Sequence, residues 1–273
     1  MTWTNSAGPV HNRGMSIVRP PDPGPGFAPI APDAAGMPLY RAVRRALLRS
    51  IEEGRLPPGA ALPNETELAS AFDVAVGTLR RAVDDLVAEH ILVRRQGRGT
   101  FVATHTRDRF LFQFFHVERS DGLREAPDVE LLSFERIRMD EDAAAALATR
   151  AGTPAFQIEN RLKLQGTAVV HDRIVIPAAL FRGLTEKRVR ERPSTIYHLY
   201  QSEFGVTVVR ARERLGAVAA DRSIARALGV SPGVPVLQVR RTAIALGGRP
   251  VEYRVSTIVT TAHDYVNQLS RPS

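Results

Sequence analysis

The hydrophobic and polar positions divide the chain into stretches with different periods. Residues 1–37 show neither a helical nor a strand period and are rich in proline and glycine. From 38 to 103, apolar residues recur at helical spacing in three segments and then alternate in two short runs. After a short polar stretch at 104–109, strand-like alternation broken by glycine turns continues to residue 273. The pattern predicts a disordered tail, a helical head, a linker and a strand-rich domain, and therefore an α+β protein.

The head, residues 38–103, has the element order of a winged helix-turn-helix. An amphipathic pattern predicts a first helix that ends at Gly54. Asn64, three residues before Glu67, predicts the start of a second helix, and a third is predicted over 76–89. A glycine turn at 96–99 between two extended runs predicts a β-wing. Because the second helix of such a motif enters the major groove, the head is predicted to bind double-stranded DNA.

Several segments of the head carry a family resemblance. LPPG, ETELA, GTLRRA and RRQGRGTFV follow one another at a spacing that resembles the DNA-binding domain of the GntR family of transcription regulators. An arginine pair on a helix is ordinarily a solvated face, but within this motif DNA contact is the favoured interpretation. The candidate DNA-binding residues implied by the resemblance are Arg44, Thr66, Val76, Thr78, Arg80, Arg81, Arg94, Arg95, Gln96, Gly97 and Arg98.

Three positions depart from the family's pattern. Thr66 stands where the family usually has arginine, and Ala75 and Val76 stand where it usually has serine and arginine. Each lost arginine contact is worth about 1–3 kcal/mol of discrimination at its base pair. Ala75 also lacks the oxygen of a serine N-cap, worth about 1 kcal/mol. We therefore expect DNA binding to persist, but we do not predict the family's usual operator sequence for this chain.

The strand-rich half contains a weak internal repeat. A helix end, a glycine-proline turn and a strand at 147–158 recur at 228–239. Two such units predict one pseudo-symmetric antiparallel sheet with helices on one side. Shared turn chemistry alone is the alternative explanation. Between the two units, the spacing of apolar residues predicts a helix over 194–204.

Four segments of this half resemble the UTRA effector domain of the HutC subfamily of GntR regulators, which has a chorismate-lyase-like fold. They are IVIPAALFRGL, PSTIYHLYQSEFGV, ARALGVSPGVPVLQVRRTA and GGRPVEYRVS, within 110–266. The resemblance implies a cleft for a small-molecule effector, formed by the hairpins and the helix between them. The candidate effector-binding residues are Phe115, His116, Arg161, Lys163, Asp172, Ser194, Thr195 and Glu252.

Each candidate effector-binding residue is named for a chemical reason. Arg161 and Lys163 lie two apart on a predicted strand, so they share a face and could clamp a carboxylate or phosphate. Ser194 and Thr195 open a helix, where free N–H groups attract an anion. Charges that alternate along a strand are otherwise simply its solvent face. An anionic effector is one candidate, and the ligand class stays open because Lys163 departs from the subfamily pattern.

The remaining candidates complete this cleft. Asp172 and Glu252 could accept hydrogen bonds from the hydroxyl groups of a sugar or from an amine. The aromatic rings of Phe115 and His116 could close the cleft from the linker side. Taken one at a time, all of these side chains have an ordinary structural interpretation. Their match to subfamily positions favours a binding site.

The amino-acid composition limits the kinds of molecule that the chain is expected to bind. The chain has 37 basic against 29 acidic residues, a formal net charge of +8, and all basic residues except Lys163 and Lys187 are arginine. This balance favours a polyanionic partner, and arginine suits bidentate contacts to phosphate and guanine. The absence of cysteine excludes disulfides and thiolate chemistry, and the seven histidines show no metal-ligand spacing. With no apolar run of membrane-spanning length and no secretory signal, the sequence predicts a soluble cytoplasmic protein without a cofactor.

Taken together, the two halves predict a ligand-responsive transcription regulator that is not an enzyme. A homodimer that binds a palindromic operator is expected, and the subfamily implies repression relieved by ligand. Two alternatives remain open: a DNA-binding protein without an effector response, and a lyase-like enzyme domain fused to a DNA-binding head. A ligand-dependent change in operator affinity would separate the regulator from the first alternative. Turnover of the ligand would identify the second.

Overall fold

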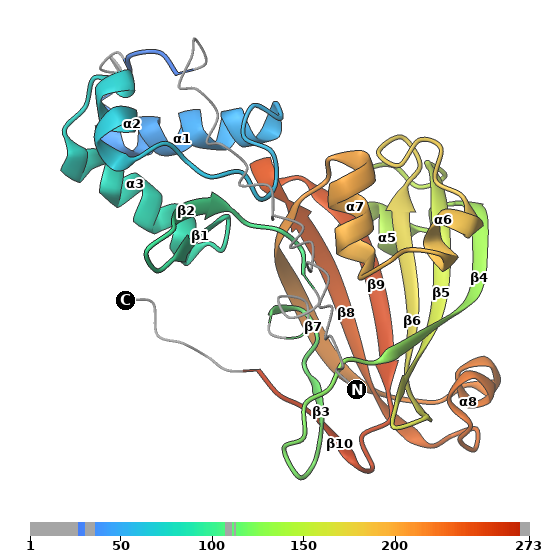
Figure 1. Ribbon diagram of the computed structural model, residues 1–273. Coiled ribbons are helices and arrows are strands. Elements are labelled where there is room, and N and C mark those ends of the chain that lie inside the picture. The colour runs from blue at the N-terminus through green and yellow to red at the C-terminus, as the bar shows by residue number, and fades with distance from the viewer. Residues whose placement is uncertain (1–26, 31–35, 107–110, 112, 268–273) are drawn as a thin grey trace, which may run out of the picture.

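The structure of the chain is a computed structural model that describes residues 27–30, 36–106, 111 and 113–267 (Figure 1). A small helical head is followed by a larger domain built on a six-stranded antiparallel sheet. This order confirms the α+β class predicted from the sequence. Residues 1–26 and 31–35 of the predicted tail and 107–109 of the predicted linker lie outside the described residues, and the exact domain boundaries stay predictions.

The head has the predicted winged helix-turn-helix order. Its elements are α1 (Leu39–Glu52), α2 (Glu65–Phe72), α3 (Val76–Ala88), β1 (Leu92–Arg95) and β2 (Gly99–Val102). Helix α2 begins where the side-chain oxygen of Asn64 accepts the Glu67 N–H at 2.8 Å. It ends at Asp73, whose φ of 53° lies in the left-handed region and turns the chain into α3. The helices enclose a core that includes Leu47, Phe72 and Leu79.

One segment of the predicted tail is packed on this head. The rings of Phe27 and Phe72 meet edge to face with 5.1 Å between centroids, and the Ile30 N–H donates to the Phe72 carbonyl at 2.9 Å. The prediction of disorder throughout 1–37 is therefore wrong for residues 27–30. The physical reason is that Phe27 and Ile30 carry apolar side chains large enough to join the head's core cluster.

The second domain repeats one unit twice. Its main elements are β4 (Asp128–Arg138), α5 (Glu141–Ala146), β5 (Pro154–Leu164), β6 (Thr167–Pro177), α6 (Glu186–Arg190), α7 (Ile196–Phe204), β7 (Val208–Ala219), α8 (Arg222–Leu228), β8 (Pro235–Ala245), the short turn η1 (Leu246–Gly248) and β9 (Pro250–Ile258). The spatial order β4-β5-β6-β9-β8-β7 is symmetric about the β6–β9 pair. A smaller pair joins β3 (Val117–Arg119) to β10 (His263–Tyr265).

The two units match in detail, which confirms the predicted pseudo-symmetry. Asp140 accepts the Ala143 N–H at 2.7 Å to begin α5, and Asp221 accepts the Ile224 N–H at 2.8 Å to begin α8. Each helix packs across the centre of the sheet, since α5 contacts β9 and α8 contacts β6. The helix of each unit therefore covers a strand of the other unit.

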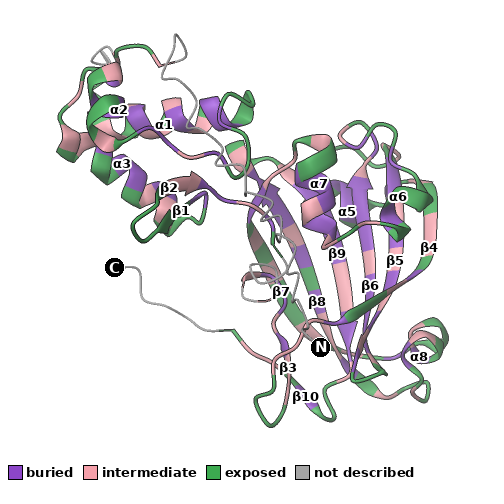
Figure 2. Ribbon diagram, viewed as in Figure 1, coloured by how far each residue is buried: buried purple, intermediate pink, exposed green. Residues whose placement is uncertain are grey.

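The helices lie on both faces of the sheet, so the prediction of helices on one side is wrong. Helices α5 and α8 cover one face, which we call the outer face, while α7 covers the opposite, inner face (Figure 1). The inner face carries the main core, in which Ile158 and Ile174 lie with Tyr197 and Tyr200 of α7 (Figure 2). Strand alternation decides which residues can reach a site on the inner face.

The chain leaving the wing is packed against α7. The His105 N–H donates to the Gln201 side-chain oxygen at 3.0 Å, and the His105 ring lies 6.0 Å from that of Phe114 and 5.7 Å from that of Tyr197. Gln201 also donates to the carbonyl of Ala103. The first residues of the predicted linker are thus fixed to the effector domain.

Candidate DNA-binding surface and effector pocket

The first two turns of α3 and the neighbouring start of α2 form an exposed surface on the head. Thr66, Arg80 and Arg81 are exposed, and Val76 and Thr78 are half-buried. The helical period explains this exposure, because residues such as Leu79 and Leu86 occupy the buried side of α3. Ala75 occupies the N-cap without a side-chain hydrogen bond, as its residue type dictates.

Two carboxylates, Glu65 and Asp84, connect helix α3 to the wing. Both Nε and Nη2 of Arg80 donate to Oε2 of Glu65, at 2.9 and 2.7 Å. Arg94 on β1 pairs with Asp84 at 2.5 Å and lies 4.0 Å from Oε1 of Glu65. The hydrogen bond with Glu65 raises the pKa of Arg80 above its ordinary value, so the guanidinium stays charged. Glu65 and Asp84 thus orient two cations on one surface.

The other candidate arginines rest on aromatic rings. The Arg81 guanidinium lies 4.1 Å from the ring centroid of Tyr40, and that of Arg95 lies 4.8 Å from that of Phe101. At the wing tip Gln96, Gly97 and Arg98 are exposed, and Gly97 has a φ of +67°. Apart from Arg44, the candidates named from the sequence therefore lie on α2, α3 and the wing.

Arg44 is placed differently. Its Nη2 pairs with the carboxylate of Glu89 at 2.6 Å. It lines a groove that runs between α1 and the effector domain, with Arg45 and Arg210 among the other lining residues. The structure therefore groups Arg44 with the boundary between the domains instead of with Arg80.

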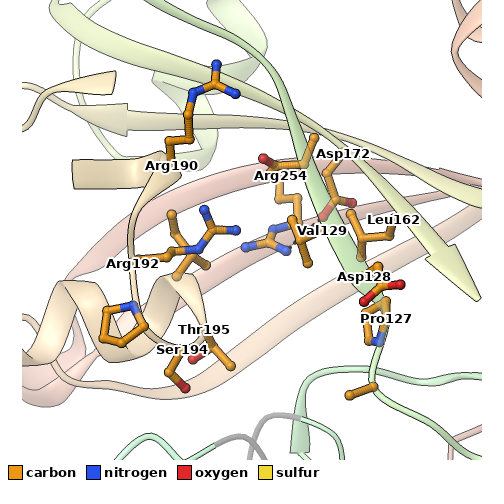
Figure 3. Close-up of a pocket in the computed structure, with 14 residues that line it drawn as sticks. Pro127, Asp128, Val129, Leu162, Asp172, Arg190, Arg192, Ser194, Thr195 and Arg254 are labelled. Atoms are coloured by element: carbon orange, nitrogen blue, oxygen red, sulfur yellow. Dashed lines mark hydrogen bonds and ion pairs between the residues drawn. The ribbon is translucent and has the colours of Figure 1, made fainter. Parts of the chain in front are cut away.

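A pocket of about 390 Å³ opens on the inner face of the sheet beside the start of α7 (Figure 3). Its walls come from the start of β4, from the sheet and from the segment that joins α6 to α7. It is lined by Ala126, Pro127, Asp128, Val129, Asn160, Leu162, Asp172, Arg190, Arg192, Pro193, Ser194, Thr195, Ile196 and Arg254. Its volume lies within the range of about 300–1,000 Å³ that small-molecule sites occupy.

Two guanidinium groups point into this pocket from opposite walls. Figure 3 shows Arg192, before α7, and Arg254, on β9, directed into the same space. Arg192 donates from Nη1 to the Val189 carbonyl, and its buried Nε has no hydrogen-bond partner. Burial lowers the pKa of Arg192, and the nearby charge of Arg254 adds to that shift. An anion between the two groups would stabilise the charged guanidinium and so oppose this shift.

The sheet supplies an acceptor and a donor network below these cations. Asn160 is 3% exposed, and its side-chain oxygen has no hydrogen-bond partner. Asp172 accepts from Arg254 Nη1 at 3.0 Å and from the Ser256 hydroxyl at 2.5 Å. Ser194 lies at the pocket edge, and Thr195 caps α7 by accepting the His198 N–H at 3.2 Å. The pocket can therefore bind an anionic group and a hydroxyl or amine at the same time.

Glu252 fixes Arg254 from behind and is itself fully buried. Its two carboxylate oxygens accept hydroxyl hydrogen bonds from Tyr197 at 2.9 Å and Tyr200 at 2.8 Å, and they accept from Arg254 at 3.0 and 3.2 Å. Burial, followed by the charge of Glu252, raises the pKa of both tyrosines, so their hydroxyls remain protonated donors. Because every acceptor of Glu252 is engaged, this residue supports the pocket without contacting a ligand.

The two residues of the predicted cation clamp lie away from this pocket. Arg161 and Lys163 do share a face of β5, as expected, but that face is the outer one, whereas Asn160 and Leu162 face the pocket. Both cations bind Glu130, Arg161 at 2.7 Å and Lys163 at 2.9 Å. Hydrogen bonds from Arg161 and Lys163, assisted by their charges, lower the pKa of Glu130 to about 2. The sequence pattern showed that they share a face but not which face.

Phe115 and His116 are also absent from this pocket. Phe115 is buried in the main core, and the His116 ring lies 5.4 Å from that of Tyr265 on β10. Of the predicted effector residues, Asp172, Ser194 and Thr195 line the pocket. The structure adds Asn160, Arg192 and Arg254, which sequence reasoning missed. A polar residue on an otherwise apolar strand face, as Asn160 is, was the available signal.

The described part of the chain contains neither a membrane-spanning helix nor a cluster of metal-binding side chains. No helix there has both the length and the hydropathy needed to cross a membrane. Nor do the described residues include a cluster of three or more histidine, aspartate or glutamate side chains placed to hold a metal ion.

A DNA-binding head followed by a domain with a ligand-sized polar pocket defines a ligand-responsive transcription regulator. Comparison with known families agrees with this class. Residues 39–102 match the model of the bacterial regulatory proteins of the gntR family, and residues 123–264 match that of the UTRA domain. The chain therefore belongs to the GntR family and carries a UTRA effector domain, in agreement with the HutC-type resemblance seen in its sequence.

Individual relatives extend over both domains. The chain is 28% identical over 240 residues to the HTH-type transcriptional repressor NagR of Bacillus subtilis, covering 87% of this chain and 97% of NagR. It is 30% identical over 229 residues to the HTH-type transcriptional regulator Rv0792c of Mycobacterium tuberculosis, covering 79% of this chain and 80% of that protein. A GntR-type ligand-binding domain from Bordetella bronchiseptica, solved by crystallography, is 36% identical with a TM-score of 0.55, covering 58% of this chain and 99% of that one.

Proposed function

We propose that the chain is a repressor that binds a palindromic operator as a homodimer and releases it when a small anionic metabolite occupies the pocket. Repression is supported by the similarity to NagR, whose name describes a transcriptional repressor. Two-fold symmetry would place two copies of α3 in successive major grooves, about 34 Å apart. A cytoplasmic location follows from the proposed role, because the operator lies there.

The observation that carries the ligand proposal is Arg192. Its Nε is buried without a partner, and its guanidinium faces Arg254 across the pocket. A phosphate or carboxylate accepts several hydrogen bonds in this geometry and adds the favourable field at the N-terminus of α7. The unpaired oxygen of Asn160 needs a donor, which a hydroxyl or amine of the same ligand would provide. The ligand class that fits is a sugar-like or amine-bearing metabolite with one anionic group.

Binding without turnover is the interpretation we favour for this pocket. The relatives that align over both domains are transcription regulators. A lyase-like activity would require a turned-over ligand, and incubation of candidate metabolites with the protein followed by mass spectrometry tests for product. A DNA-binding protein without an effector response would leave Arg192 without the anion that its position favours.

The DNA assignment is tested by Arg80→Ala in gel-shift titrations with the promoter DNA next to the gene. Loss of a bidentate arginine is expected to weaken specific binding by about 1–3 kcal/mol, or roughly tenfold to a hundredfold. Arg226→Ala, an exposed arginine on α8, removes the same charge far from the head and should leave affinity nearly unchanged (Figure 1). Equal binding by Arg80→Ala and the unsubstituted protein would contradict the assignment.

The ligand assignment is tested by thermal unfolding with inorganic phosphate, sugar phosphates, sugar acids and neutral sugars. An anionic ligand at a hundredfold excess over its Kd should stabilise the protein by about 2.7 kcal/mol. Arg192→Gln should abolish that stabilisation. The matched control is Arg188→Gln on α6, because Arg188 is exposed, pairs with Glu203 and does not line the pocket. Stabilisation by neutral sugars alone would overturn the anionic class.

A further inference from the structure

Residues 27–30, which we call the brace, pack on the head at the point where α2 turns into α3. In Figure 1 the brace is the blue stretch at the top of the head. The ring of Phe27 meets that of Phe72 edge to face, with 5.1 Å between the centroids. Phe72 is the last residue of α2 and is 1% exposed. The brace therefore covers the end of the first helix of the helix-turn-helix.

The brace also hydrogen-bonds to the end of that helix. The last four carbonyls of an α-helix have no partner within the helix itself. In α2, the carbonyl of Ala69 accepts from the Val74 N–H at 3.0 Å, which comes from the chain that follows the helix. The carbonyl of Phe72 accepts instead from the Ile30 N–H at 2.9 Å. The C-terminal end of α2 is thus completed by a segment that precedes α1.

The start of α3 is weakly restrained by its own residues. Ala75 at its N-cap has no side-chain oxygen to accept a hydrogen bond, whereas Asn64 at the N-cap of α2 has one. The first turn reads Val76, Gly77 and Thr78, so it carries no acidic side chain and includes a poor helix former. This turn also holds two of the candidate DNA-binding residues. Its position must therefore be fixed by packing.

One apolar cluster connects the brace to that turn. Phe27 and Ile30 of the brace pack against the cluster in which Phe72 is buried, and so do Val74 in the turn and Val76 at the start of α3. Protein interiors are densely packed, so the loss of a ring leaves a space into which neighbouring groups shift. The first turn of α3 has few restraints of its own and is the neighbour expected to move.

We propose that the brace positions the recognition helix: Phe27 and Ile30 hold the turn between α2 and α3 and thereby set where the first turn of α3 meets the bases. The proposal rests on the proposed binding of α3 to an operator and does not depend on the effector pocket. A brace that only added apolar burial would stabilise the head without changing DNA specificity. The ratio of specific to random-sequence binding separates these two roles.

The ratio is measured for Phe27→Ala in gel-shift titrations, at a temperature at which circular dichroism shows every variant folded. Affinity for the promoter DNA next to the gene should fall by about fivefold, the factor that corresponds to the loss of one helix-end restraint. Affinity for random-sequence DNA should stay the same, because it depends on backbone charge. Phe27→Leu should keep most of the specific affinity, and Pro29→Ala, at an exposed position of the brace, all of it. An unchanged ratio for Phe27→Ala would overturn the proposal.

A second variant asks whether the brace and the missing cap act on the same turn. Ala75→Ser places a side-chain oxygen at the N-cap of α3. In that background, Phe27→Ala should lose no more than about half of the specificity ratio that it loses in the parent, because two restraints on one turn are not additive. Equal losses in the two backgrounds would contradict a shared site of action.

Amide hydrogen exchange examines the turn without DNA. The N–H groups of Thr78 and Leu79 donate to the Ala75 carbonyl at 2.9 and 3.2 Å, and at the other end of α3 the Glu89 N–H donates to the Asp85 carbonyl at 3.0 Å. Phe27→Ala should speed exchange at the first two amides and leave the third unchanged. Equal acceleration at both ends of α3 would indicate a general loss of stability and would overturn the positioning role.

Arg80→Ala in the same titrations separates failure of this proposal from failure of the DNA assignment. If Arg80→Ala weakens specific binding and Phe27→Ala does not, the operator is bound through α3 and the brace has no part in positioning it. If neither variant weakens specific binding, the assignment of α3 to the operator is wrong and the positioning proposal falls with it.

Discussion

The head and the effector domain use arginine in opposite surroundings. On the head, the side chain of Arg80 is 58% exposed and that of its partner Glu65 is 35% exposed. In the effector domain the corresponding figures are 5% for Arg254 and 0% for Glu252. An exposed pair contributes only about 0–1 kcal/mol, so Arg80 can exchange its carboxylate for DNA at little cost. A buried pair cannot be opened without leaving a charge unpaired, so Arg254 acts as a fixed part of the framework.

The largest loss of stability is expected when the buried ion pair of Arg254 and Glu252 is broken. Glu252→Ala removes the partner of Arg254 and the acceptor of two tyrosine hydroxyls. Breaking a buried pair from one side typically costs about 3–5 kcal/mol of unfolding free energy. Urea denaturation of the full chain measures the loss. Glu135→Ala, an exposed control on β4, should stay within about 0.5 kcal/mol of the parent. A loss below about 1 kcal/mol for Glu252→Ala would mean that the network is not structural.

Breaking the exposed ion pair of Arg80 and Glu65 is expected to have a smaller effect on stability and to act mainly on DNA binding. Glu65→Gln keeps the shape of the side chain but removes the charge that orients Arg80 and Arg94. Unfolding free energy should change by less than about 1 kcal/mol. Binding to random-sequence DNA should strengthen slightly, while the ratio of specific to random binding should fall several-fold.

Gel-shift titrations at two salt concentrations measure both quantities for Glu65→Gln, because random binding depends steeply on salt. Glu67→Gln, an exposed glutamate on the same helix, is the charge-matched control. If both variants behave alike, the effect is one of net charge and Glu65 does not position the arginines.

The smallest effect concerns pH and a second buried group of charges. Burial lowers the pKa of His116 below its ordinary value of 6.5; the charge of Glu213 opposes this shift, and Arg241 and Arg124 assist it. The unfolded chain therefore takes up a proton at a higher pH than the folded one. Stability from neutral His116 is fully present above about pH 6.5 and is lost as pH falls through the lower folded value. When the denaturation midpoint is measured between pH 5 and 8, it should decrease toward pH 5. His116→Gln should make the midpoint depend less on pH. An unchanged slope in the variant would assign the acid sensitivity to other groups.

Local sequence signals predicted the elements of the fold well. The Asn64 cap, the wing glycines and the repeat of a helix end, a turn and a strand each determine structure within a few residues, and each was found where expected. The sequence did not determine which face of the sheet a strand residue lies on, or which residues distant in the chain it contacts. The alternation of β5 showed that Arg161 and Lys163 share a face, but only the docking of α7 on the opposite face settled that they lie away from the pocket.

The pocket itself was only partly predictable for the same reason. Ser194 and Thr195 were found because a helix start can be recognised locally. Arg192 and Arg254 come together from a loop and a distant strand, and no local pattern records that approach. Phe115 and His116 were expected at the cleft because they follow the linker, but the packing of the core and of β10 carries them elsewhere.

The crossed packing of α5 and α8 has a consequence for how the protein is made. Most of the head's core can form early in synthesis, because α1 to β2 come before the rest of the chain and only Val209 of β7 and Leu246 join it later. Helix α5 packs early with Ala155 on β5 and Val175 on β6, but Tyr253 on β9, close to the C-terminal end of the domain, completes this cluster late. The first half of the sheet must therefore emerge from the ribosome with an uncovered apolar surface, and the domain closes late, in one cooperative step. A nascent chain that stalls before β9 would have a finished DNA-binding head and no finished pocket to control it.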